Sequence, residues 1–127
     1  MEILQIVGQV VFGLFFVVNG VHHLMKPTET ANYAKSKQVP LPMFTSLATG
    51  VLLILGGGAM VIGYYVMYAL LALVVFLVVV AFWMHAFWSV QDPSHRMNEM
   101  FHFMNNIAMA GALCLLTAYV DSWPWVF

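Results

Sequence analysis

Four long apolar runs constrain the fold of this chain more than any other feature of its sequence. A helix needs about 20 predominantly apolar residues to cross the hydrocarbon core of a bilayer. Inside lipid the backbone must satisfy its own hydrogen bonds, so runs of this length form helices there. We therefore predict an all-α protein, a four-transmembrane-helix bundle that contacts lipid and forms a single membrane domain over residues 1–127. The predicted helices cover residues 3–25, 43–62, 65–88 and 98–120.

The polar composition that remains excludes several classes of protein. Hydrophobic residues make up 63% of the 127 residues and charged residues only 7%, so no room is left for a soluble catalytic domain. The formal net charge of -1 excludes the strongly basic surface that a nucleic-acid-binding protein needs. We expect no nucleic-acid partner.

The two larger connections between the helices lie on the same side of the predicted bundle. In the first, Pro27 and Thr28 can start a short interfacial helix between the first two spanning helices, which Pro40 and Pro42 would end. Every lysine and arginine lies in these two connections, namely Lys26, Lys35, Lys37 and Arg96. By the positive-inside rule we predict a multi-pass protein of the inner (plasma) membrane, with both connections in the cytoplasm and the termini outside.

Small and aromatic residues predict how the helices pack and where they end. Glycines and alanines are frequent in residues 43–62 and 98–120, which predicts that these two helices line the closest contacts. Aromatic residues gather at the side of the termini and predict an interfacial girdle. Its members are Tyr64, Tyr65, Tyr119, Trp123 and Trp125.

Polar side chains gather at the opposite end of the bundle. Helical periodicity turns Asn19 and His23 toward the interior, whereas His22 points away. In the last helix, spacings of three and four residues put three more polar side chains on one face, and the third helix adds a histidine. Polar groups at this depth are costly unless they pair or meet water, so they are functional candidates. The predicted polar site consists of Asn19, His23, His85, Glu99, His102 and Asn106.

Two chemistries and one structural role suit these residues. Glu99 and His102 have the Glu-x-x-His spacing of di-iron bundles, but only one such pair is present. A single transition metal held by His23, His85, Glu99 and His102 is one hypothesis. A quinone site is another, because histidine beside a carboxylate can relay the protons that quinone reduction takes up. In the structural alternative, these histidines close the bundle end by bonding to water or lipid phosphate.

Several short motifs follow one another along almost the whole chain. They are Asn19-Gly20-Val21-His22-His23-Leu24, Pro27, the stretch 33–42, the glycine cluster 56–58, His85-Ala86-Phe87-Trp88, and His102-Phe103-Met104-Asn105-Asn106 followed by Gly111. In this order and spacing they resemble the DoxX family of small four-helix integral membrane proteins. Asn105 departs from the pattern, since lysine is typical of close relatives there. The positions that match family motifs are Gly20, His23, His85, Trp88 and Asn106.

The resemblance implies a role in redox chemistry. The family takes its name from a membrane subunit associated with a thiosulfate:quinone oxidoreductase, and other members are linked to redox defence complexes. By analogy we expect a quinone-linked or redox-associated membrane subunit, with quinone as ligand and a redox partner subunit or a second copy as partner. One alternative is a non-enzymatic scaffold that docks a cytoplasmic protein through residues 28–37. Another is a carrier of a small molecule or a metal.

Overall fold

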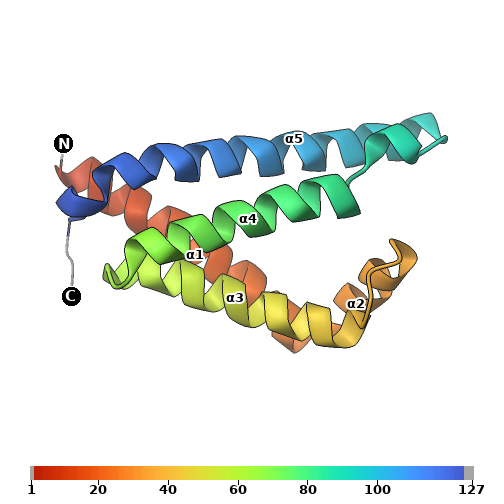
Figure 1. The fold of residues 1–127 in the computed structure, drawn as a ribbon, viewed down its shortest axis with the longest axis horizontal. Coiled ribbons are helices and arrows are strands. Elements are labelled where there is room, and N and C mark those ends of the chain that lie inside the picture. The colour runs from red at the N-terminus through yellow and green to blue at the C-terminus, as the bar shows by residue number, and fades with distance from the viewer. Residues whose placement is uncertain (1, 125–127) are drawn as a thin grey trace.

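The computed structural model describes residues 2–124, and helices account for nearly all of them. No strand is present in this range, which confirms the all-α prediction. Four helices within it are long and apolar enough to cross a membrane. The elements are α1 (Glu2–Met25), α2 (Pro27–Ser36), α3 (Pro42–Ile62), α4 (Val66–Met84), the 3-10 turn η1 (Phe87–Ser89), α5 (Pro93–Leu116) and the 3-10 turn η2 (Thr117–Ser122) (Figure 1).

The helix boundaries agree with the predictions at most ends. Helix α5 ends at Leu116, four residues before the predicted end at 120, and two further ends differ. Helix α5 begins at Pro93, five residues before the predicted start at 98, because Asp92 is its N-cap and accepts a hydrogen bond from the His95 backbone nitrogen at 3.1 Å. Asp-Pro is thus a cap followed by a first helical residue. Helix α4 ends at Met84, four residues before the predicted end, and η1 follows it. Both shifts occur beside the predicted polar site.

The spanning helices pack in the order α1, α3, α4, α5. The most extensive contacts join α1 to α3 and α4 to α5, and the α3–α4 hairpin joins these two pairs. The hairpin reverses the chain through Gly63 and Tyr65, which have positive φ angles of 77° and 51°. From this hairpin α3 and α4 diverge, and α2 lies beside their separated ends (Figure 1). The bundle is therefore closed near the termini and widens toward α2.

The closest helix contact lies between α1 and α3. A Cβ atom added to Gly57 would lie 2.4 Å from the Gly13 carbonyl oxygen, and one added to Gly20 would lie 2.5 Å from the Gly50 carbonyl oxygen. Small residues thus mark the seam, as predicted, on α3. The same expectation for the last helix is wrong at Gly111, where an added Cβ would meet nothing within 4 Å.

The apolar core lies toward the closed end of the bundle. Phe16, Met60, Leu70, Leu73 and Leu113 are the largest fully buried side chains. Trp123 closes this end, with 8% of its surface exposed and its indole nitrogen donating to the Met60 carbonyl oxygen at 2.9 Å. Trp123 is therefore a core residue and not the interfacial anchor that its position predicted. Trp125, also assigned to the girdle, lies outside the described residues.

Candidate functional site

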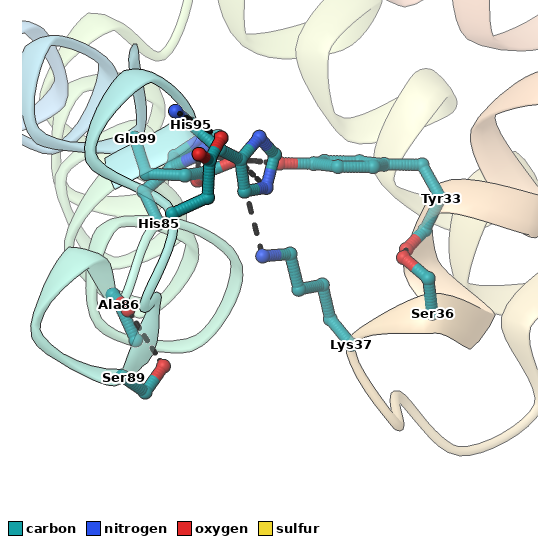
Figure 2. A network of polar contacts seen from close by, with 9 residues as sticks. Tyr33, Ser36, Lys37, His85, Ala86, Ser89, His95 and Glu99 are labelled. Atoms are coloured by element: carbon teal, nitrogen blue, oxygen red, sulfur yellow. Dashed lines mark hydrogen bonds and ion pairs between the residues drawn. The ribbon is translucent and has the colours of Figure 1, made fainter. Parts of the chain in front are cut away.

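The wide end of the bundle is organised around one carboxylate, that of Glu99 in the second turn of α5. Its side chain is 4% exposed. The Tyr33 hydroxyl donates to Glu99 Oε1 at 2.9 Å, and His85 Nδ1 donates to Glu99 Oε2 at 2.8 Å. Figure 2 shows Tyr33 and His85 meeting at this carboxylate from different parts of the chain. Glu99 thereby connects α2, the end of α4, and α5.

Two basic side chains complete the surroundings of Glu99. Lys37 Nζ lies 3.9 Å from Oε1, and the exposed imidazole of His95 lies 4.0 Å from the same oxygen. The Lys37 ammonium also lies 5.8 Å from the centre of the Tyr33 ring. A buried carboxylate is strongly unfavourable unless hydrogen bonds and opposite charge compensate its lost hydration. This arrangement supplies both from three segments (Figure 2).

His102 joins the cluster through His85. The two imidazole rings stack with their centres 5.0 Å apart and their planes inclined by 25°. His102 is exposed and lies one turn after Glu99 on α5. The predicted grouping of His85, Glu99 and His102 is therefore present in the structure.

His23 belongs to a second polar group, on α1 and α3. Its Nδ1 lies 3.2 Å from both the Ser46 carbonyl oxygen and the Thr49 hydroxyl. A carbonyl oxygen only accepts, so Nδ1 carries the proton and Nε2 of the neutral ring is an acceptor. The neighbouring His22 is exposed, as its helical phase predicted.

The two predicted asparagines lie apart from these groups. Asn19 is exposed, and its amide donates to the Phe15 carbonyl oxygen one turn earlier in α1, at 2.7 Å. Asn106 is partly exposed and lies one turn beyond His102 on α5. Neither makes a hydrogen bond to the Glu99 cluster among the contacts of residues 2–124.

The four residues considered as metal ligands do not converge. Within residues 2–124, no group of three or more histidine, cysteine, aspartate and glutamate side chains is arranged to hold a metal ion. His23 is hydrogen-bonded to the Ser46 carbonyl oxygen on α3, whereas His85 contacts Glu99 and His102 stacks on His85. The geometry therefore gives no support to the metal hypothesis.

A cavity of about 520 Å³ lies between α3 and α4, beneath α2. Its polar lining is concentrated at the α2 end, where His23, Thr49, Tyr33 and His85 contribute. At this end a hydrogen bond joins α4 to the residue after α2, because the Trp83 indole nitrogen donates to the Lys37 carbonyl oxygen at 3.0 Å. The remaining walls are apolar, and they include Leu52, Ala72, Val75, Phe76, Val79 and Val80.

The comparison with protein families agrees with this membrane architecture. The family model described as DoxX matches residues 4–86, about two thirds of the chain. The chain belongs to the DoxX family. It is accordingly a multi-pass membrane protein, and its four apolar helices are the spans. No curated protein and no solved structure matches it significantly.

The DoxX match covers one part of the site and ends before the other. His23, Tyr33, Lys37 and His85 fall inside the matched residues, and Glu99 lies beyond them on α5. The matched residues therefore include the cavity walls on α1 to α4 and exclude α5. The chemistry of the Glu99 cluster has to be derived from the contacts in this chain.

Tyr33 and Lys37 are the site residues that sequence reasoning missed. In the sequence, Lys37 counts only toward the positive-inside rule, and Tyr33 belongs only to the family stretch 33–42. The available signal was the face of residues 27–37, where Thr30, Tyr33 and Ala34 have helical spacing and all line the cavity.

Partial burial, together with the hydrogen bond and charge of Glu99, raises the pKa of Tyr33 well above its usual range. Tyr33 is therefore a neutral hydroxyl group at physiological pH.

Proposed function

We propose that this DoxX protein binds a lipophilic quinone in the cavity between α3 and α4 and acts as a quinone-linked membrane subunit. The observation that carries the proposal is the distribution of polar groups. They lie at the α2 end of an otherwise apolar cavity within the membrane-spanning helices. A quinone has the same division, with polar carbonyl oxygens on a ring and an apolar tail.

The size and chemistry of the cavity support this ligand. Its volume of about 520 Å³ falls in the range of roughly 300 to 1,000 Å³ that is typical of small-molecule sites. His23 and His85 each present one ring nitrogen to their protein partners, which leaves the other nitrogen for a ligand. A protonated imidazole can donate to a quinone carbonyl, and a neutral one can accept from a quinol hydroxyl.

The Glu99 cluster supports proton transfer to and from such a ring. Reduction of a quinone to a quinol adds two electrons and two protons, one proton at each carbonyl oxygen. His85 and Tyr33 line the cavity and both bond to Glu99, while His95 near the same carboxylate is exposed. Imidazole and carboxylate groups in contact are suited to relay protons.

The electrons would come from a partner subunit. The sequence has a single cysteine and no nucleotide-binding motif, so an electron donor outside this chain is part of the proposal. The two connections that carry all lysines and arginines would face the cytoplasm in the plasma membrane. A cytoplasmic redox protein would then dock beside α2 and the α4–α5 connection.

Quinone titration of matched histidine variants tests the proposal. The protein is reconstituted in lipid nanodiscs and titrated with a short-tailed benzoquinone and a short-tailed naphthoquinone, with intrinsic tryptophan fluorescence as the signal. His23→Ala and His85→Ala should each weaken binding about tenfold, the usual effect of removing one hydrogen bond to a ligand. His22→Ala is the control, because His22 is the neighbouring histidine and is exposed.

Two outcomes contradict the proposal. One is that neither quinone binds the folded protein. The other is that His23→Ala and His85→Ala bind quinone as tightly as His22→Ala does, with helical content unchanged by circular dichroism. If neither quinone binds and the folded protein still captures a cytoplasmic protein, the docking-module alternative takes the place of the quinone site.

A further inference from the structure

A second cavity continues the first one along the same face of α3 and α4. It has a volume of about 460 Å³ and runs toward the α3–α4 hairpin. Leu52 and Ala72 line both cavities, one residue on each helix. The two cavities are therefore parts of one groove, which we call the α3–α4 groove.

The lining residues of each helix form one continuous stripe. On both helices they recur at intervals of three or four residues, which is the spacing of a single helix face. On α4 and its end the stripe is Tyr65, Tyr68, Ala69, Ala72, Val75, Phe76, Val79, Val80 and Trp83. On α3 it is Thr45, Thr49, Leu52, Leu55, Gly56, Ala59 and Ile62, and three further lining residues flank this stripe, namely Ser46, Ile54 and Gly58.

The groove is as long as the bilayer core is thick. About 20 residues separate Tyr65 from His85, and at 1.5 Å per residue they extend roughly 30 Å. The hydrocarbon core of a bilayer is about 30 Å thick. One end of the groove lies at His85 and the other at Tyr64, Tyr65 and Tyr68, whose rings contact one another with centres 4.4 and 6.2 Å apart.

Polarity and side-chain size change along the groove. Hydrogen-bonding side chains lie at the α2 end, and the second cavity is lined by apolar side chains until the tyrosines. Gly58 and Ala59 keep its α3 wall low, and a Cβ added at Gly58 would meet nothing within 4 Å. The groove thus suits a thin apolar chain attached to a polar head.

We infer that the α3–α4 groove binds the long apolar tail of the ligand, and that the head of the same ligand lies at the α2 end. The ligand is then an amphiphile whose polyisoprenoid chain extends across the bilayer core. The inference rests on the proposed quinone site. A helix from a second copy does not suit the polar end, because α2 covers it and the Trp83–Lys37 hydrogen bond spans it. A quinone ring with the start of its chain is much smaller than a helix and can lie beneath α2.

The test must locate the tail, since affinity alone is a poor measure of its binding. Lipid tails are as apolar as the groove, so moving a chain from lipid into the groove gains packing but no release of water. A benzoquinone with a long isoprenoid tail carrying a diazirine at its far end is therefore photo-crosslinked to the protein in nanodiscs. The labelled peptides are identified by mass spectrometry.

We expect labelling at residues 62–68, and a short-tailed benzoquinone with the same head should compete it away. Ala72→Phe puts a ring where the two cavities join and should reduce this labelling about tenfold, the effect of forcing extra volume into an occupied site. Ala108→Phe is the matched control, because Ala108 is exposed on α5 and lines neither cavity. It should leave the labelling unchanged.

The outcomes separate this inference from the proposed function. If the short-tailed quinone binds but the tail label spreads over α1 and α5, or is not displaced by that quinone, the groove holds ordinary lipid and the inference is wrong. If the head binds but no label reaches residues 62–68, the inference is also wrong, and this is the result expected when a second copy covers the groove. If the short-tailed quinone does not bind at all, the proposed function fails and the inference fails with it.

Discussion

The seam between α1 and α3 predicts a large difference between two adjacent glycine-to-alanine substitutions. In Gly57→Ala the new Cβ would lie 2.4 Å from the Gly13 carbonyl oxygen and 2.9 Å from the Val17 backbone nitrogen. Ordinary contacts of a Cβ atom begin at about 3.4 Å. Because the atoms that it meets belong to the backbone, no side-chain rotation relieves the clash, and the helices must separate by about 1 Å.

The expected cost follows from this separation. Overpacking of this kind destabilises proteins by about 1 to 3 kcal/mol. In Gly58→Ala, one residue further along the same helix, the new Cβ meets nothing within 4 Å. Both variants gain the same preference of alanine over glycine in a helix, about 0.5 to 1 kcal/mol. That gain cancels in the comparison, and Gly57→Ala should be less stable than Gly58→Ala by about 1 to 3 kcal/mol.

Unfolding in mixtures of a mild detergent and sodium dodecyl sulfate measures this difference. Helical circular dichroism gives the midpoint of unfolding for the wild type and for the two variants. The midpoint of Gly57→Ala should fall clearly below the other two. Equal midpoints for Gly57→Ala and Gly58→Ala would refute the close α1–α3 contact.

Three further predictions concern hydrogen bonds at other points of the fold. The pKa of Tyr33 is raised in the folded protein, so Tyr33 should contribute its full stabilisation at pH values below its ordinary pKa of 10.0. This stabilisation should be lost as the pH rises further, because the unfolded chain releases the proton first. Tyr33→Phe should therefore show a smaller alkaline decrease in Tm. Trp123→Phe should cost about 0.5 to 1.5 kcal/mol in the same detergent assay by removing the hydrogen bond to Met60, and an equal cost for the exposed Trp88→Phe would contradict this. Asp92→Ala should cost about 0.5 to 2 kcal/mol by removing the α5 N-cap, and Asp92→Asn should restore nearly all of it, an outcome that thermal unfolding can check.

The helices were predictable because lipid imposes strict requirements on the sequence. Apolar length and flanking prolines located α1, α2 and α3 to within one or two residues. Helical periodicity also identified His85, Glu99 and His102 as candidates for one site, and these three residues do gather. Periodicity is sufficient there because α4 and α5 are neighbours in sequence and in space.

The remaining features depend on contacts that no local pattern encodes. Tyr33 reaches Glu99 across 66 positions in the sequence, and this depends on where α2 lies over the widened bundle. His23 is hydrogen-bonded to α3 because α1 packs closely on Gly50 and Gly57, and this packing fixes the direction in which the His23 side chain points. Trp123 has the position of an interfacial anchor, and only the tertiary fold shows that Met60 accepts its hydrogen bond.

The position of Glu99 on the last spanning helix has a consequence for biosynthesis. Helices are released from the ribosome in chain order, so α1 to α4 emerge before α5. Until then Tyr33 and His85 lack the carboxylate that both contact in the finished protein. The polar end is therefore completed last, and a polypeptide truncated after α4 would keep the walls of the cavity without the carboxylate that Tyr33 and His85 share.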